Sequence, residues 1–145
     1  MRLGFYLMGS EPVERVLPLI ARAALAQDQR LLVVAGDAGV LDRLDRALWE
    51  GKPEEFLPHG RADAAHAGRQ PVLLSKTCVP ANGAKLVALA DGAWRDEAEG
   101  FERALLFFGE EQRTEARQTW RRFDGREDVT REFFELEDGK WTKRA

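Results

Sequence analysis

The sequence contains few of the residues that cross-link a small protein or bind a metal ion. Its 145 residues include one cysteine, Cys78, and two histidines, His59 and His66. A single cysteine cannot form an internal disulfide, and these three residues do not match the ligand spacing of a zinc site. A chain of this length buries roughly two-thirds of the surface that it exposes when unfolded. We therefore expect residues 1–145 to fold as one domain without a metal ion or a disulfide.

Long hydrophobic runs and an excess of basic charge are also missing. No apolar segment approaches the ~20 residues of a membrane-spanning helix, and the first residues lack the apolar stretch of a signal peptide. Together with the unpaired cysteine, this predicts a protein of the reducing cytoplasm without membrane contact. The net charge of −3 and the pI of about 5.5 provide no general attraction to nucleic acids. Any binding by basic residues would have to be local.

The hydrophobic residues that are present form short, nearly continuous runs, as in strands that are buried on both faces of a sheet. There are five such runs, at residues 3–8, 30–35, 71–75, 85–90 and 103–108. Helical periodicity between several of them favours an α/β domain with a mainly parallel sheet and helices on both faces. Near the end of the chain, Asp138 and Gly139 lie between two extended pieces, which predicts a C-terminal hairpin.

Four helices are expected, over residues 13–25, 37–50 and 110–123, with a short one near 94–100. Pro18 falls inside the first pattern, so that helix either kinks there or begins its regular part nearby. The second helix should begin at Asp37, a favourable N-cap, and end before a long loop over residues 51–70. Trp49 lies roughly 130° from the centre of the apolar stripe of this helix, at about 100° per residue. We therefore expect Trp49 to point away from the core.

No catalytic or nucleotide-binding motif stands out. The glycine-rich dinucleotide fingerprint is absent after the first strand, and no phosphate-binding loop with its lysine occurs. Gly36 and Gly39 come nearest to one, but the Asp37 carboxylate between them would repel a phosphate. Nucleophilic catalysis would require Ser75 or Cys78 to meet one of the two histidines, and proximity in sequence does not supply the geometry that such a pair needs. His59 is interpreted as a loop residue that forms hydrogen bonds. These motifs predict no catalytic residue, no cofactor and no metal.

The helix over residues 110–123 brings basic and aromatic side chains together. Arg113, Arg117 and Trp120 fall on one side at helical spacing, whereas Ala116 and Phe123 face the core. Two guanidinium groups beside a partly exposed indole could hold carboxylates and an aromatic ring. Alternatively, the two arginines only pair with nearby acids of their own helix, and such exposed pairs contribute little. The spacing alone leaves both interpretations open.

The stretch LDRALWEGKPEEFLPHG at residues 44–60 resembles the chi subunit family of bacterial DNA polymerase III, which carries LD-x-x-LW followed by a F-[LV]-P-H loop. Further resemblance is found in FYL (5–7), GRQPVLLS (68–75) and ARQTWRRF (116–123). The resemblance implies a Rossmann-like fold that binds no nucleotide and an accessory subunit without catalytic residues. It also implies two partners: the psi subunit, which leads to the clamp loader, and the acidic C-terminal tail of the single-stranded DNA-binding protein. DNA would be reached only indirectly.

The resemblance also implies where the tail peptide binds. That tail ends in phenylalanine, so its receptor needs donors for carboxylates and an apolar slot for one ring. By position, Arg117 would bind the terminal carboxylate and Arg113 the acids before it. The residues expected to form this single site are Trp49, Phe56, Pro58, Phe108, Arg113, Arg117 and Trp120.

Two other functions are compatible with an α/β domain of this kind. One is an enzyme that binds a small molecule or a nucleotide at the ends of parallel strands. The other is direct binding of single-stranded DNA by stacking on aromatic side chains beside arginines. The acidic balance of the chain argues against the second.

Overall fold

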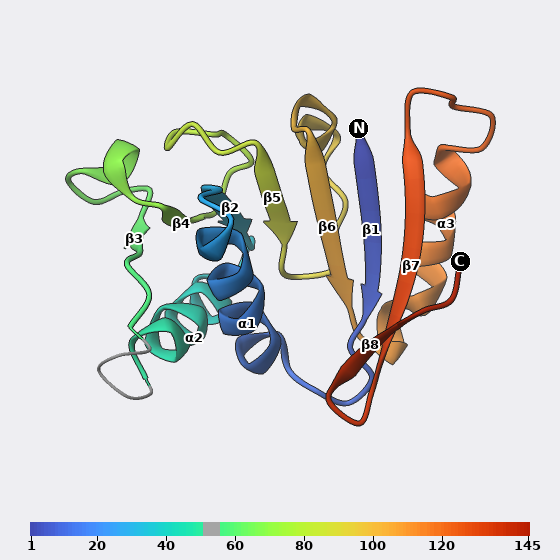
Figure 1. Ribbon diagram of the computed structural model, residues 1–145, viewed down its shortest axis with the longest axis horizontal. Helices are drawn as coiled ribbons and strands as arrows, with labels where there is room; N and C mark the ends of the chain where they lie inside the picture. Colours follow the sequence, from blue (N-terminus) through green and yellow to red (C-terminus); the bar gives the residue numbers. More distant parts are fainter. Residues whose placement is uncertain (51–55) are drawn as a thin grey trace.

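The computed structural model describes residues 1–50 and 56–145, and its centre is one mainly parallel β-sheet (Figure 1). The eight strands follow the order β3-β4-β2-β5-β6-β1-β7-β8. Neighbouring strands are parallel except for the antiparallel pair β7–β8. The strands are β1 (Arg2–Leu7), β2 (Leu31–Val34), β3 (Gly60–Arg61), β4 (Val72–Ser75), β5 (Leu86–Leu89), β6 (Arg103–Phe108), β7 (Thr130–Glu137) and β8 (Lys140–Lys143).

The five apolar runs predicted as strands are β1, β2, β4, β5 and β6, each within one or two residues of its expected bounds. Their buried residues alternate between two hydrophobic clusters, one on each face of the sheet. In β2, for example, Leu31 and Val33 face one cluster, whereas Leu32 and Val34 face the other. The predicted loop over residues 51–70 contains the short edge strand β3, which has no apolar run to reveal it.

The predicted helices are also present, as α1 (Val13–Ala26), α2 (Ala38–Trp49), α3 (Arg113–Arg122) and the 3₁₀ helix η3 (Asp96–Gly100). Among the described residues, two further 3₁₀ turns are η2 (Ala67–Arg69) and η4 (Glu110–Gln112), and η4 leads directly into α3. Helix α1 continues through Pro18, which lacks only the N–H that would bond to the preceding turn. Asp37 caps α2, where its Oδ1 accepts a hydrogen bond of 2.6 Å from the Gly39 N–H.

The long helices cover opposite faces of the sheet. Leu17 of α1 and Leu44 of α2 belong to the cluster on one face, whereas Ala116 of α3 belongs to the cluster on the other. Figure 1 shows α1 and α2 over the half of the sheet that contains β2 and β4, and α3 beside β7 near the other edge. This arrangement confirms the expectation of helices on both faces. It also places the exposed surfaces of α2 and α3 on opposite faces of the sheet.

The C-terminal hairpin completes the edge of the sheet at β7 and β8. Asp138 and Gly139 have φ angles of 50° and 76°, as the two central residues of a tight hairpin turn require. The C-terminal hairpin predicted from Asp138 and Gly139 is therefore confirmed. After β8 the chain stays on β7: the Phe133 N–H donates to the Ala145 carbonyl oxygen at 3.2 Å. Ala145 also lines a cavity together with Phe5 of β1 and Ala116 of α3.

Candidate functional site

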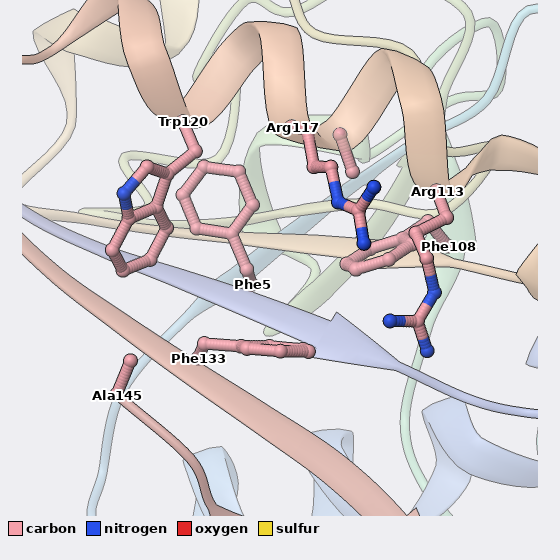
Figure 2. A pocket seen from close by; sticks show the side chains of 8 residues that line it. Phe5, Phe108, Arg113, Arg117, Trp120, Phe133 and Ala145 are labelled. Atoms are coloured by element: carbon pink, nitrogen blue, oxygen red, sulfur yellow. The ribbon is translucent and has the colours of Figure 1, made fainter.

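A cavity of about 330 Å³ lies between α3 and the sheet. This volume is at the small end of the range for ligand pockets, roughly 300–1,000 Å³. Figure 2 shows α3 above the cavity and the strands below it, with the arginine side chains directed from the helix toward Phe108. The lining residues are Phe5, Phe108, Arg113, Ala116, Arg117, Trp120, Phe133 and Ala145.

The floor of the cavity is aromatic because of the strand register. Phe5 in β1 is paired with Phe133 in β7, and Leu7 of β1 is paired with Phe108 in β6. The rings of Phe108 and Phe133 stack with their centroids 6.3 Å apart, and the Trp120 ring lies 5.0 Å from that of Phe5. Ala116 is small and leaves the space open. A flat apolar group therefore finds aromatic contact on several sides.

The rim of the cavity carries two arginines with different partners. Arg113 donates two hydrogen bonds of 3.0 Å to the carboxylate of Glu110. These bonds raise the pKa of Arg113 and lower the pKa of Glu110. No ion pair is found for Arg117 within residues 1–50 and 56–145. The interpretation that the arginines only pair with their own helix thus applies to Arg113 and leaves the guanidinium of Arg117 available.

The geometry suits a ligand that carries a ring next to a carboxylate. A guanidinium group binds a carboxylate through two parallel hydrogen bonds, and these are stronger than hydrogen bonds between neutral groups. At the cavity, the guanidinium group of Arg117 lies one helical turn from that of Arg113, and both lie above the apolar floor. Four of the residues predicted from the sequence meet here: Phe108, Arg113, Arg117 and Trp120.

Trp49 and Phe56 form a second aromatic cluster with His59. The rings of Trp49 and Phe56 are 4.8 Å apart, and the two side chains are 62% and 43% exposed. The His59 side chain is only 1% exposed, with Nδ1 2.7 Å from the Leu57 carbonyl oxygen and Nε2 2.7 Å from Asp45 Oδ1. The predictions that Trp49 points outward and that His59 forms hydrogen bonds in its loop are both confirmed.

The expected single slot is divided between these two places. Trp49 and Phe56, with the exposed Pro58 next to Leu57, do not line the cavity at α3. Helix α2 packs beside β4 on one face of the sheet, whereas α3 packs on the other face beside β1 and β7. The periodicity of one helix shows which side faces the core, but it does not show which face of the sheet that core belongs to.

Phe5 and Phe133 are lining residues that the sequence analysis did not identify. Phe5 belongs to the apolar strand β1, where an aromatic side chain suggests ordinary core packing, whereas Phe133 belongs to the mostly charged strand β7. Their sequence positions are far apart, and they meet only through the parallel pairing of β1 and β7. The alternation of β7, where Phe133 and Phe134 point to opposite faces, was the one signal that could have suggested a ring at this position.

The carboxyl edge of the sheet, where α/β proteins bind nucleotides, is occupied by carboxylates. Asp91 accepts a hydrogen bond of 2.9 Å from the Gly36 N–H and two more from Arg95 at 2.8 and 2.9 Å. Burial opposes the charge of Asp91, but the hydrogen bonds from Arg95 and Gly36 outweigh it and lower the pKa of this carboxyl. Asp37 similarly holds the Gly39 N–H. The backbone N–H groups of Gly36 and Gly39, the pair nearest to a phosphate-binding motif, are therefore already bonded to carboxylates.

The candidate nucleophiles Cys78 and Ser75 each have defined local surroundings. Cys78 is buried, and this burial raises the pKa of its thiol, which disfavours the reactive thiolate. Ser75 Oγ exchanges a hydrogen bond with Thr77 Oγ1 at 3.2 Å. Within the described residues, no three His, Cys, Asp or Glu side chains are grouped as metal ligands. In the same part of the chain, no helix has the length and apolar character needed to cross a bilayer.

A search of curated proteins found no match to this chain. A family model, in contrast, matches residues 1–128, which include α3 with Arg113, Arg117 and Trp120 and leave β7 and β8 outside the match. That model describes the DNA polymerase III chi subunit, HolC, and because it covers most of the 145 residues, the chain belongs to the chi subunit family.

Proposed function

We propose that this chi subunit is a non-catalytic adaptor that binds the acidic C-terminal tail of the single-stranded DNA-binding protein in the cavity at α3. Its family makes it an accessory component of DNA polymerase III, and the adaptor role would connect the clamp-loader complex to coated single-stranded DNA in the cytoplasm. The observation that carries the proposal is the combination of two arginine forks with an aromatic floor in one cavity.

Each part of such a tail has a matching feature in the cavity. The terminal phenylalanine ring would lie on Phe108 and Phe133, where burial of an aromatic group supplies much of the affinity of a peptide interface. Its carboxylate would bind the fork of Arg117. An acid upstream would bind Arg113 by replacing Glu110, since one carboxylate is exchanged for another. Attraction between these charges should weaken as salt concentration rises.

The Trp49–Phe56 cluster is proposed as the contact for a second partner, the psi subunit or another clamp-loader subunit. Large apolar side chains that stay exposed beside one another are typical of protein interfaces. Because the cluster and the cavity lie on opposite faces of the sheet, the two partners would bind at the same time.

Calorimetric titration of the full chain with a short acidic peptide ending in phenylalanine tests the proposal. Two matched peptides serve as controls: one has alanine as its last residue, and the other has an amidated C-terminus. We expect binding of the first peptide, weaker binding of both controls, and a loss of affinity from 50 to 300 mM salt. No heat with the first peptide, or equal affinity for all three, would contradict the proposed function.

A further inference from the structure

The indole of Trp120 is held in place by an arginine that does not line the cavity. Arg131, in β7, places its guanidinium carbon 4.7 Å from the centroid of the Trp120 ring. The same guanidinium donates hydrogen bonds to the Trp120 carbonyl oxygen and, at 2.8 Å, to Asp124 Oδ1. The Arg131 side chain is 21% exposed, so these contacts are partly shielded from water.

These contacts join three parts of the structure at one point. Trp120 belongs to the last turn of α3, where its carbonyl oxygen accepts a hydrogen bond of 3.3 Å from the Phe123 N–H in place of the usual bond from four residues further on. Arg131 donates a second hydrogen bond to this oxygen, pairs with Asp124 in the turn after the helix, and contacts the ring itself. The ring also contacts Phe5 of β1 at 5.0 Å. The position of the indole is therefore set by β7 as well as by its own helix.

We propose that Arg131 is a positioning residue of the tail-binding cavity: it fixes Trp120 as a wall and does not bind the peptide's carboxylates itself. This inference rests on the proposed function. The guanidinium of Arg131 is already bonded to a carboxylate and to a carbonyl group, and the residue is absent from the cavity lining. Arg117, in contrast, lines the cavity and has no ion pair within the described residues.

Charge and geometry are separable at this position. Lysine keeps the positive charge but loses the planar fork that reaches the carbonyl oxygen, the carboxylate and the ring together. Glutamine removes the charge as well. A positioning role predicts that Arg131→Lys and Arg131→Gln weaken peptide binding alike, by about three- to tenfold, because both release the indole. A direct role in carboxylate binding predicts that lysine restores most of the affinity.

Calorimetry at several salt concentrations, with Arg117→Gln as the matched control, tests the inference. We expect both Arg131 variants to bind more weakly with the salt dependence of the unmodified protein, whereas Arg117→Gln should reduce that dependence. The indole N–H signal of Trp120 in an NMR spectrum, assigned with Trp120→Phe, should shift in both Arg131 variants without peptide. Full affinity in Arg131→Lys, a reduced salt dependence in Arg131→Gln, or an unmoved indole signal would overturn the inference.

Failure of the proposed function would look different from failure of this inference. If the unmodified protein does not bind the peptide, the adaptor proposal fails, while the indole signal still reports whether Arg131 positions Trp120. Thermal unfolding of each variant, measured in parallel, distinguishes a displaced Trp120 ring from unfolding of the whole domain. Arg131→Lys serves if Arg131→Gln is too unstable to measure.

Discussion

Replacing Arg117 by alanine should weaken the binding of the acidic tail peptide far more than the same change at Arg113. Arg117 lines the cavity without an ion pair in the described part of the chain, so its whole fork is available to the peptide. Arg113 already holds Glu110 through two hydrogen bonds of 3.0 Å. A peptide carboxylate at Arg113 replaces an existing partner, and the net gain from this exchange is small.

The size of each effect follows from this difference. A hydrogen bond to a charged group contributes about 1.5–3 kcal/mol, which corresponds to a loss of roughly 10- to 150-fold in affinity for Arg117→Ala. Arg113→Ala should cost about fivefold or less, as expected when one exposed ion pair replaces another. Arg117→Lys should fall between the unmodified protein and Arg117→Ala, because lysine keeps the charge but not the fork.

The assay is calorimetric titration at 50 mM salt with the peptide that ends in phenylalanine. Arg122→Ala is the matched control, since Arg122 belongs to the same helix but pairs with Asp96 at 2.8 Å, away from the cavity. Its affinity should equal that of the unmodified protein. The reasoning is refuted if Arg113→Ala costs more than Arg117→Ala, or if Arg122→Ala weakens binding as much as either.

Three more changes give outcomes of different kinds. Glu110→Gln should tighten peptide binding by about two- to fivefold in the same titration, because it removes the internal partner of Arg113; weaker binding would show that Glu110 orients Arg113 for the peptide. Asp91→Asn should lower the free energy of unfolding at pH 7 by about 1–2 kcal/mol, because the Arg95 fork loses its carboxylate. Since the pKa of Asp91 is lowered in the folded protein, the stability from its charge is present above the ordinary Asp range and is lost as pH falls through the lowered pKa. Urea unfolding should therefore show a smaller difference between the two proteins at pH 3 than at pH 7, and a constant difference would contradict this. Trp49→Ala should leave peptide affinity unchanged while abolishing copurification with a clamp-loader partner. Weakened peptide binding would instead show that Trp49 takes part in the peptide site.

Much of the fold follows from local sequence patterns. The strands can be recognised as continuous apolar runs because a parallel sheet that is covered on both faces has no polar side. Its strands therefore do not alternate between apolar and polar residues. Asp37 at the start of α2 and the Asp138-Gly139 pair in the hairpin act through their own backbone neighbours, so their roles are readable from a few residues. The same is true of the outward direction of Trp49 and of the inward face of Ala116 and Phe123, which helical periodicity sets.

The composition of the site, in contrast, depends on contacts between distant segments. Phe5 and Phe133 become the floor of one cavity only because β1 and β7 pair in parallel with that register. Arg131 reaches Trp120 because β7 returns beside α3. A sequence determines which residues a helix or strand turns toward the core, since that depends on neighbours three or four positions away. Which face of the sheet each helix covers is decided by the crossovers between strands, and for this reason only the tertiary structure separated the cluster at Trp49 from the cavity at Arg117.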